Sequence, residues 1–111
     1  MAKTTPKVYG QHLFCYPDPM PVCTVASPAW FIWLETATTF RYFSQQRRNV
    51  YNGYGSLFAP VSFRKEQRRQ GWLWYAYRRV HGSLHKRYVG KTTVLTMERL
   101  EETAVLLNEI W

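Results

Sequence analysis

The stretch from Gly71 to Lys91, GWLWYAYRRVHGSLHKRYVGK, constrains the fold most, because it predicts a β-hairpin. Residues 72–80 and 84–89 are rich in aromatic residues, Arg and Val, as is typical of strands. His81 and Gly82 lie between them and form a two-residue loop, with Gly where a positive φ is needed. The loop fixes how the two strands pair.

If His81 and Gly82 form the loop, Val80 faces Ser83, and pairing outward from this end predicts two faces. The face that we expect to be exposed carries Tyr75, Tyr77, Arg79, Lys86 and Tyr88. The face that we expect to pack in the core carries Trp72, Trp74, Ala76, Arg78, His85, Arg87 and Val89. A flat surface of Tyr, Arg and Lys suits phosphates and base edges. The alternative is an ordinary two-sided sheet with one solvated face.

The positive charge is concentrated in one part of the chain. Residues 1–36 have no net charge, residues 37–91 carry twelve Lys or Arg against Glu66 alone, and residues 92–111 have a net charge of −3. A segregated basic surface indicates a polyanionic partner, and the lack of a basic amphipathic helix favours nucleic acid over a membrane.

The length of 111 residues predicts one domain with a single core. Two cysteines define no disulfide framework, and no signal peptide is recognisable, so we expect a reducing, cytoplasmic setting, at the nucleoid if the protein binds DNA. No apolar run reaches the roughly 20 residues that span a bilayer.

The other elements follow in chain order. We expect residues 1–26 to be loop or extended chain, with a short strand at 22–25. A short helix should begin at Pro28, capped by Ser27, and a strand should cover 38–43. Residues 45–56 form a basic loop, and a strand from Val61 should lead through Gln70-Gly71 into the hairpin.

A helix should begin after Thr96 and cover the Trp74 face of the sheet. The predicted fold is therefore α+β: an antiparallel sheet of three or four strands, packed on one face by a C-terminal helix, with a short N-terminal helix. Residues 27–44 would hold the short helix and first strand, and residues 57–111 a β-meander plus the C-terminal helix.

Several chemistries are disfavoured. Gly90-Lys91-Thr92 is not a phosphate-binding loop, because the glycine required five residues earlier is His85. His12, Cys15 and Cys23 lack a fourth ligand and match no zinc spacing. No carboxylate pair or activated nucleophile stands out. We expect neither an enzyme nor a cofactor nor a metal.

Two segments resemble a known family. WYAYRRVHGSLHKRYVGKTTVLTMERLEETA resembles the N-terminal segment of MalT-like, LuxR-type transcriptional regulators of Chloroflexi-type bacteria, and SPAWFIWLETATTFRY resembles the segment that precedes it there. The sequence contains neither the ATPase domain nor the helix-turn-helix of those regulators.

More distantly, the arrangement is similar to the arm-site-binding domain of tyrosine recombinases and to plant ethylene-response-factor domains. In the plant domains the third strand ends in an aromatic-apolar-Gly step, which Tyr88-Val89-Gly90 matches. This implies a three-stranded sheet in a major groove, although Tyr75 and Tyr77 depart from the pattern toward the stacking expected for RNA or single strands.

The sequence thus predicts a small DNA-binding protein, acting in transcription regulation or mobile-element DNA transactions. The alternative is a protein-interaction subunit of a larger complex. The residues expected to contact nucleic acid are Arg64, Arg68, Tyr75, Tyr77, Arg79, Lys86 and Tyr88. The residues expected to contact phosphates are Arg47, Arg48, Arg69, Arg87 and Lys91.

Overall fold

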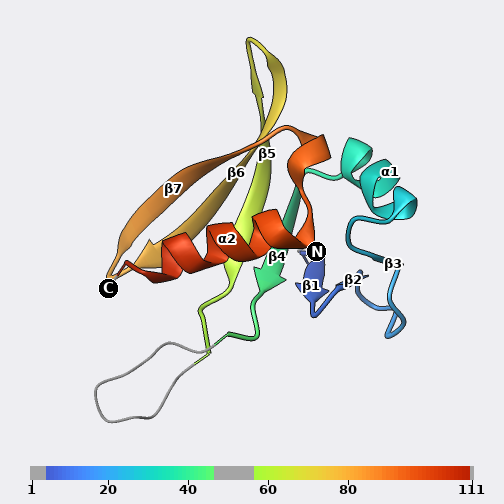
Figure 1. Ribbon diagram of the computed structural model, residues 1–111, viewed down its shortest axis with the longest axis horizontal. Coiled ribbons are helices and arrows are strands. Elements are labelled where there is room, and N and C mark those ends of the chain that lie inside the picture. The colour runs from blue at the N-terminus through green and yellow to red at the C-terminus, as the bar shows by residue number, and fades with distance from the viewer. Residues whose placement is uncertain (1–4, 47–56, 111) are drawn as a thin grey trace.

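The computed structural model describes residues 5–46 and 57–110, which form an α+β fold around a mixed sheet of seven strands (Figure 1). The sheet order is β3-β2-β1-β4-β5-β6-β7. The strands are β1 (Lys7–Tyr9), β2 (His12–Phe14), β3 (Cys23–Thr24), β4 (Thr39–Phe43), β5 (Val61–Arg68), β6 (Gly71–Val80) and β7 (Ser83–Gly90). The helices are α1 (Pro28–Thr36), the 3₁₀ turn η1 (Thr92–Val94) and α2 (Met97–Asn108). No helix in the described part of the chain is long and apolar enough to cross a membrane.

The central hairpin has the predicted register from its loop to Tyr75, beyond which a β-bulge shifts the pairing so that Trp74 lies opposite Gly90. Val80 pairs with Ser83, Tyr77 with Lys86 and Tyr75 with Tyr88. His81 has φ +48° and Gly82 has φ +82°, so both loop residues have the left-handed conformation that a type I′ turn requires. Strand β5 adds to β6 in antiparallel fashion, so β5, β6 and β7 form the expected meander.

Both helices begin at the predicted caps. The Ser27 hydroxyl accepts from the Trp30 N–H and Pro28 occupies the first turn of α1, while the Thr96 hydroxyl accepts from the Arg99 N–H at the start of α2. These side chains satisfy backbone donors that have no partner within the helix.

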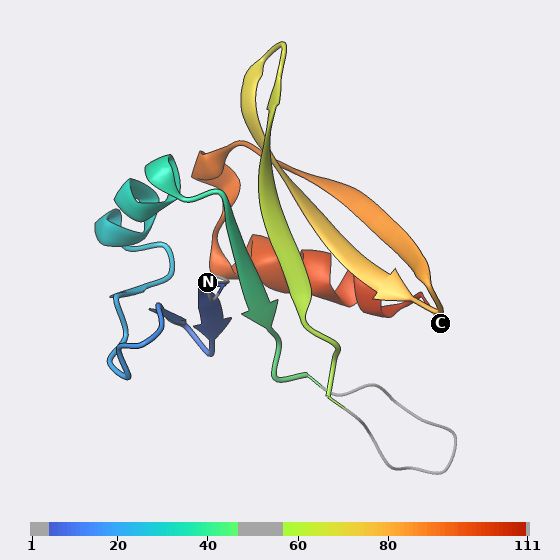
Figure 2. The same cartoon turned by 180° about the vertical axis from the view of Figure 1, so that it is seen from behind.

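The core lies between the helices and one face of the sheet. Trp74, Ala76 and Val89 are buried there together with Leu100, Ala104 and Leu107 of α2, as the hairpin pairing predicts. The Trp74 indole N–H donates to the Thr92 hydroxyl at 3.0 Å. Figure 2 shows the sheet from behind, with α2 on its far side, and no helix of the described residues covers the near face.

Gly90 allows the 3₁₀ turn η1 to pack closely against the end of β7. It ends β7 with φ +141°, and a Cβ built at this position would lie 2.7 Å from the Val94 Cγ2. Side chains with a Cβ rarely adopt this φ, so glycine alone fits both the backbone and the contact.

The prediction that residues 1–26 form loop or extended chain, apart from a short strand at 22–25, is wrong in part, and the sheet has more strands than the predicted three or four. Strands β1 and β2 form a hairpin around Gly10-Gln11, and β1 pairs with β4 in parallel. Gly10 has φ +59°, which a two-residue loop beginning with glycine requires. Val8 and Leu13 are fully buried, so burial of these two side chains stabilises the added strands.

Part of the predicted core face is also wrong. Trp72 is 53% exposed, Arg87 is exposed and His85 is half-buried. Trp72 is exposed because the β5–β6 hairpin is long, and its turn projects beyond both helices at the top of Figure 1. Trp72 pairs with Gln67 near this end, and neither α1 nor α2 reaches it.

Trp74→Ala should lower the free energy of unfolding by about 3–5 kcal/mol, because it leaves a cavity in the core. Such a loss is a large share of the 5–15 kcal/mol that is typical of a whole domain. Urea denaturation followed by circular dichroism measures the difference. Trp72→Ala is the matched control, since the same side chain on the same strand is exposed, and it should cost less than about 1 kcal/mol. Equal losses in both variants would contradict the assignment of the core.

Candidate nucleic-acid interface

The free face of the meander gathers arginines, lysines and tyrosines from three strands. Arg64 lies opposite Tyr75, which in turn lies opposite Tyr88, and Tyr77 lies opposite Lys86. Directly paired residues point to the same side of a sheet, so these side chains share the face that α2 does not cover (Figure 2). Arg64, Lys86 and Tyr88 are exposed, and Tyr75 and Tyr77 are half-buried.

The cations lie over the tyrosine rings. The Lys86 Nζ is 4.3 Å from the centroid of the Tyr75 ring, the Arg68 Cζ is 5.2 Å from the same centroid, and the Arg64 Cζ is 5.6 Å from that of Tyr77. Tyr75 and Tyr88 meet edge to face, with centroids 5.6 Å apart. Cation–π contacts of this kind hold long basic side chains over the sheet, so their charged ends are partly oriented before any ligand binds.

Glu66 is the one acid in this cluster. Its Oε2 lies 2.8 Å from the Lys86 Nζ and 3.2 Å from the Arg68 Nη2. The hydrogen bond from Lys86 is the largest cause that lowers the pKa of Glu66, and the same bond raises the pKa of Lys86. Glu66 therefore stays ionised and links a side chain of β5 to one of β7 across the intervening strand.

An open groove of about 580 Å³ borders this cluster at the projecting end of the meander. Its lining consists of Arg68, Arg69, Gln70, Leu73, Tyr75, Tyr88 and Lys91. Three of these residues are cationic and exposed, and Leu73 is buried beneath them. The groove can therefore hold an anion along its cationic rim, while its floor presents apolar and aromatic groups.

The remaining predicted site residues lie elsewhere. Arg79 is on the same face but at the opposite end of the hairpin, where its Nη1 donates to the Gly82 carbonyl at 3.1 Å. Arg87 pairs with Ala76 and so lies on the helix-covered side of the sheet, opposite to Arg64, Lys86 and Tyr88. Arg47 and Arg48 lie outside the described residues.

Sequence analysis missed the other half of the free face. Lys7 pairs with Arg41, and Tyr9 pairs with Phe43, so strands β1 and β4 carry the same mixture of cations and aromatic rings. The signal was present in KVYGQHLF, where Val8 and Leu13 flank a Gly-Gln loop at symmetric positions, but three-residue strands show too little alternation to stand out.

No group of three or more His, Cys, Asp or Glu side chains within residues 5–46 and 57–110 is arranged to hold a metal ion. The half-buried thiols of Cys15 and Cys23 are free, and burial raises the pKa of each, which keeps them protonated.

No family model, curated protein or solved structure matches this chain. The resemblance to the MalT-like regulators therefore stays a prediction from the sequence.

The Glu66 carboxylate should titrate below its ordinary pKa of 4.5, and Lys86→Met should raise that pKa by removing the nearest cation. Because the pKa of Glu66 is lower in the folded state than in the unfolded state, the pairing stabilises the fold at pH values above the pKa of unfolded Glu66. This contribution is lost as the pH falls through the pKa of folded Glu66. NMR of the side-chain carboxyl carbon measures the titration. Arg79→Met is the control, since Arg79 lies on the same face without an ion pair to Glu66. An unchanged pKa in Lys86→Met would contradict the pairing.

Proposed function

We propose that the protein binds duplex DNA with the free face of β5, β6 and β7. The observation that carries this proposal is the separation of charge across the sheet. Arg64, Arg68 and Lys86 lie on the uncovered face, whereas the exposed acids Glu98 and Glu102 belong to α2 on the other side. A polyanion is therefore attracted to the first face in preference to the second, where these acids accompany the exposed Arg87.

The shape of the meander supports the same proposal. The β5–β6 hairpin projects beyond the body of the protein as a two-stranded ribbon, with Arg68 and Arg69 near its tip (Figure 1). The major groove of B-DNA is about 12 Å wide and admits such a ribbon. The ribbon can enter the groove while the rest of the free face lies along the backbone.

The side chains divide into two roles. Arg64 and Arg68 carry planar guanidinium groups, which pair in bidentate fashion with the O6 and N7 atoms of guanine. Arg69 and Lys91 line the groove, and Lys86 lies on the edge strand β7. These three side chains suit phosphates, which position a protein on DNA without specifying sequence. Glu66 keeps Arg68 and Lys86 in place and disfavours a phosphate directly above it.

Arg64→Ala and Arg68→Ala should each weaken binding by about 1–3 kcal/mol where the side chain contacts a base. Where it contacts a phosphate instead, the slope of log K against log salt should fall by about 0.9. A duplex selected from a random-sequence library by sequencing the bound molecules serves as the probe, titrated by fluorescence anisotropy at several salt concentrations. Arg87→Ala is the matched control, because Arg87 is an exposed arginine of the same hairpin on the opposite face, and it should change the affinity little.

Two results would contradict the proposal. The first is binding with no salt dependence, since phosphate contacts release counterions. The second is equal weakening by Arg87→Ala and Arg64→Ala. If wild-type protein retained one stoichiometric protein partner from nuclease-treated lysate, and Tyr88→Ala abolished that capture, the face would instead be a protein-docking surface with an aromatic anchor.

A further inference from the structure

The free face continues past the meander as one row of side chains across six strands. Successive pairings place Lys86 beside Tyr77, Tyr77 beside Ser62, and Ser62 beside Arg41. The row goes on from Arg41 to Lys7 of β1 and ends at Phe14 of β2. Five strand spacings of about 4.8 Å make the row about 24 Å long.

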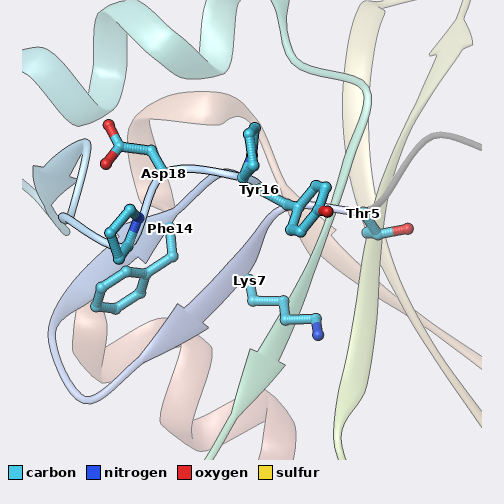
Figure 3. Close-up of a pocket in the computed structure, with 7 residues that line it drawn as sticks. Thr5, Lys7, Phe14, Tyr16 and Asp18 are labelled. Carbon is cyan, nitrogen blue, oxygen red and sulfur yellow. The ribbon is translucent and has the colours of Figure 1, made fainter.

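The row ends at a small aromatic pocket. Figure 3 shows Phe14 and Tyr16 on two sides of this pocket, with Lys7 next to them. Thr5, Pro17, Asp18 and Pro19 complete its lining. Tyr16 is 76% exposed, so the face of its ring is available to a ligand.

The size and lining of the pocket favour a single planar ring. Its volume is about 260 Å³, below the range of about 300–1,000 Å³ that is usual for drug-sized ligands. Aromatic rings and prolines offer stacking surfaces. A base can use them only when it is unpaired, because a paired base is already stacked within the duplex.

A second aromatic pair lies beside the row. Tyr9 and Phe43 stack with ring centroids 4.4 Å apart and an angle of 15° between the rings, and Tyr9 is 43% exposed. Cations that follow a backbone, with aromatic rings alongside for the bases, are the arrangement by which proteins bind single strands.

We propose that β4, β1, β2 and the turn at residues 16–19 bind a single-stranded extension of the duplex, with one unpaired base stacked in the pocket of Phe14 and Tyr16. Lys7 and Arg41 contact the phosphates that lead from the meander to this base. The inference rests on the proposed function, since it places the single strand at the end of the face that holds the duplex.

The test compares four labelled probes by fluorescence anisotropy: a blunt duplex, the same duplex with a dT overhang at its 5′ end, the same duplex with a dT overhang at its 3′ end, and oligo-dT alone. Wild-type protein should bind one of the overhang duplexes at least about fivefold more tightly than the blunt duplex, as one base–aromatic stack predicts. Tyr16→Leu should lose this gain and keep the affinity for the blunt duplex, whereas Tyr16→Phe should retain the gain. Lys7→Ala should also reduce the gain, because it removes a phosphate contact.

Failure of this inference and failure of the proposed function give different results. If wild-type protein binds blunt and overhang duplexes equally, or if Tyr16→Leu retains the gain, the single-strand site is overturned and the duplex proposal stands. If the protein binds oligo-dT in a Tyr16-dependent way but not the blunt duplex, the duplex proposal fails and the base pocket stands. Binding to none of the probes overturns both.

Discussion

The ring of Phe40 is the contact on which the arrangement of the layers depends. It stacks on the Phe63 ring with the two rings nearly parallel and their centroids 5.0 Å apart. Its centroid also lies 5.4 Å from that of the Trp74 ring and 5.3 Å from that of the Trp30 ring. One side chain thus joins β4, β5 and β6 to α1. Because the Trp30 indole N–H also donates to the Leu95 carbonyl just before α2, both helices are held to the same face of the sheet. No helix within residues 5–46 and 57–110 covers the opposite face.

Not every cation of the basic block serves that open face. The Lys65 Nζ donates to the Leu34 carbonyl at 2.6 Å and to the Glu35 carbonyl at 3.1 Å, at the C-terminal end of α1, and burial lowers its pKa. The Arg78 Nη1 donates to the Leu107 carbonyl at 2.6 Å and to the Ile110 carbonyl at 3.0 Å, at the end of α2. Each cation lies at the negative end of a helix dipole. Net charge alone therefore overstates the charge that is available to a ligand.

The parts of the fold that were predictable from the sequence are those whose constraints are local. The His81-Gly82 loop fixes the pairing of the strands on either side of it, and Ser27 and Thr96 mark the helix starts through side-chain caps. The N-terminal strands were missed because each is three residues long and β1 pairs with a strand about thirty residues away. The exposure of Trp72 was missed because it depends on how far α2 extends along β6, which no local pattern encodes.

Gly90 lies where β7 leads into the 3₁₀ turn before α2, and this position affects how a mutational screen of the protein is interpreted. It ends the strand that carries Tyr88 and Lys86, and it also leaves the space that Val94 occupies as the chain turns toward α2. A larger residue there would force the 3₁₀ turn away from the sheet and strain the backbone. A screen for loss of function would therefore recover position 90 beside true contact residues, although glycine has no side chain with which to touch a ligand. Distinguishing the two kinds of hit requires a measure of folding for every variant.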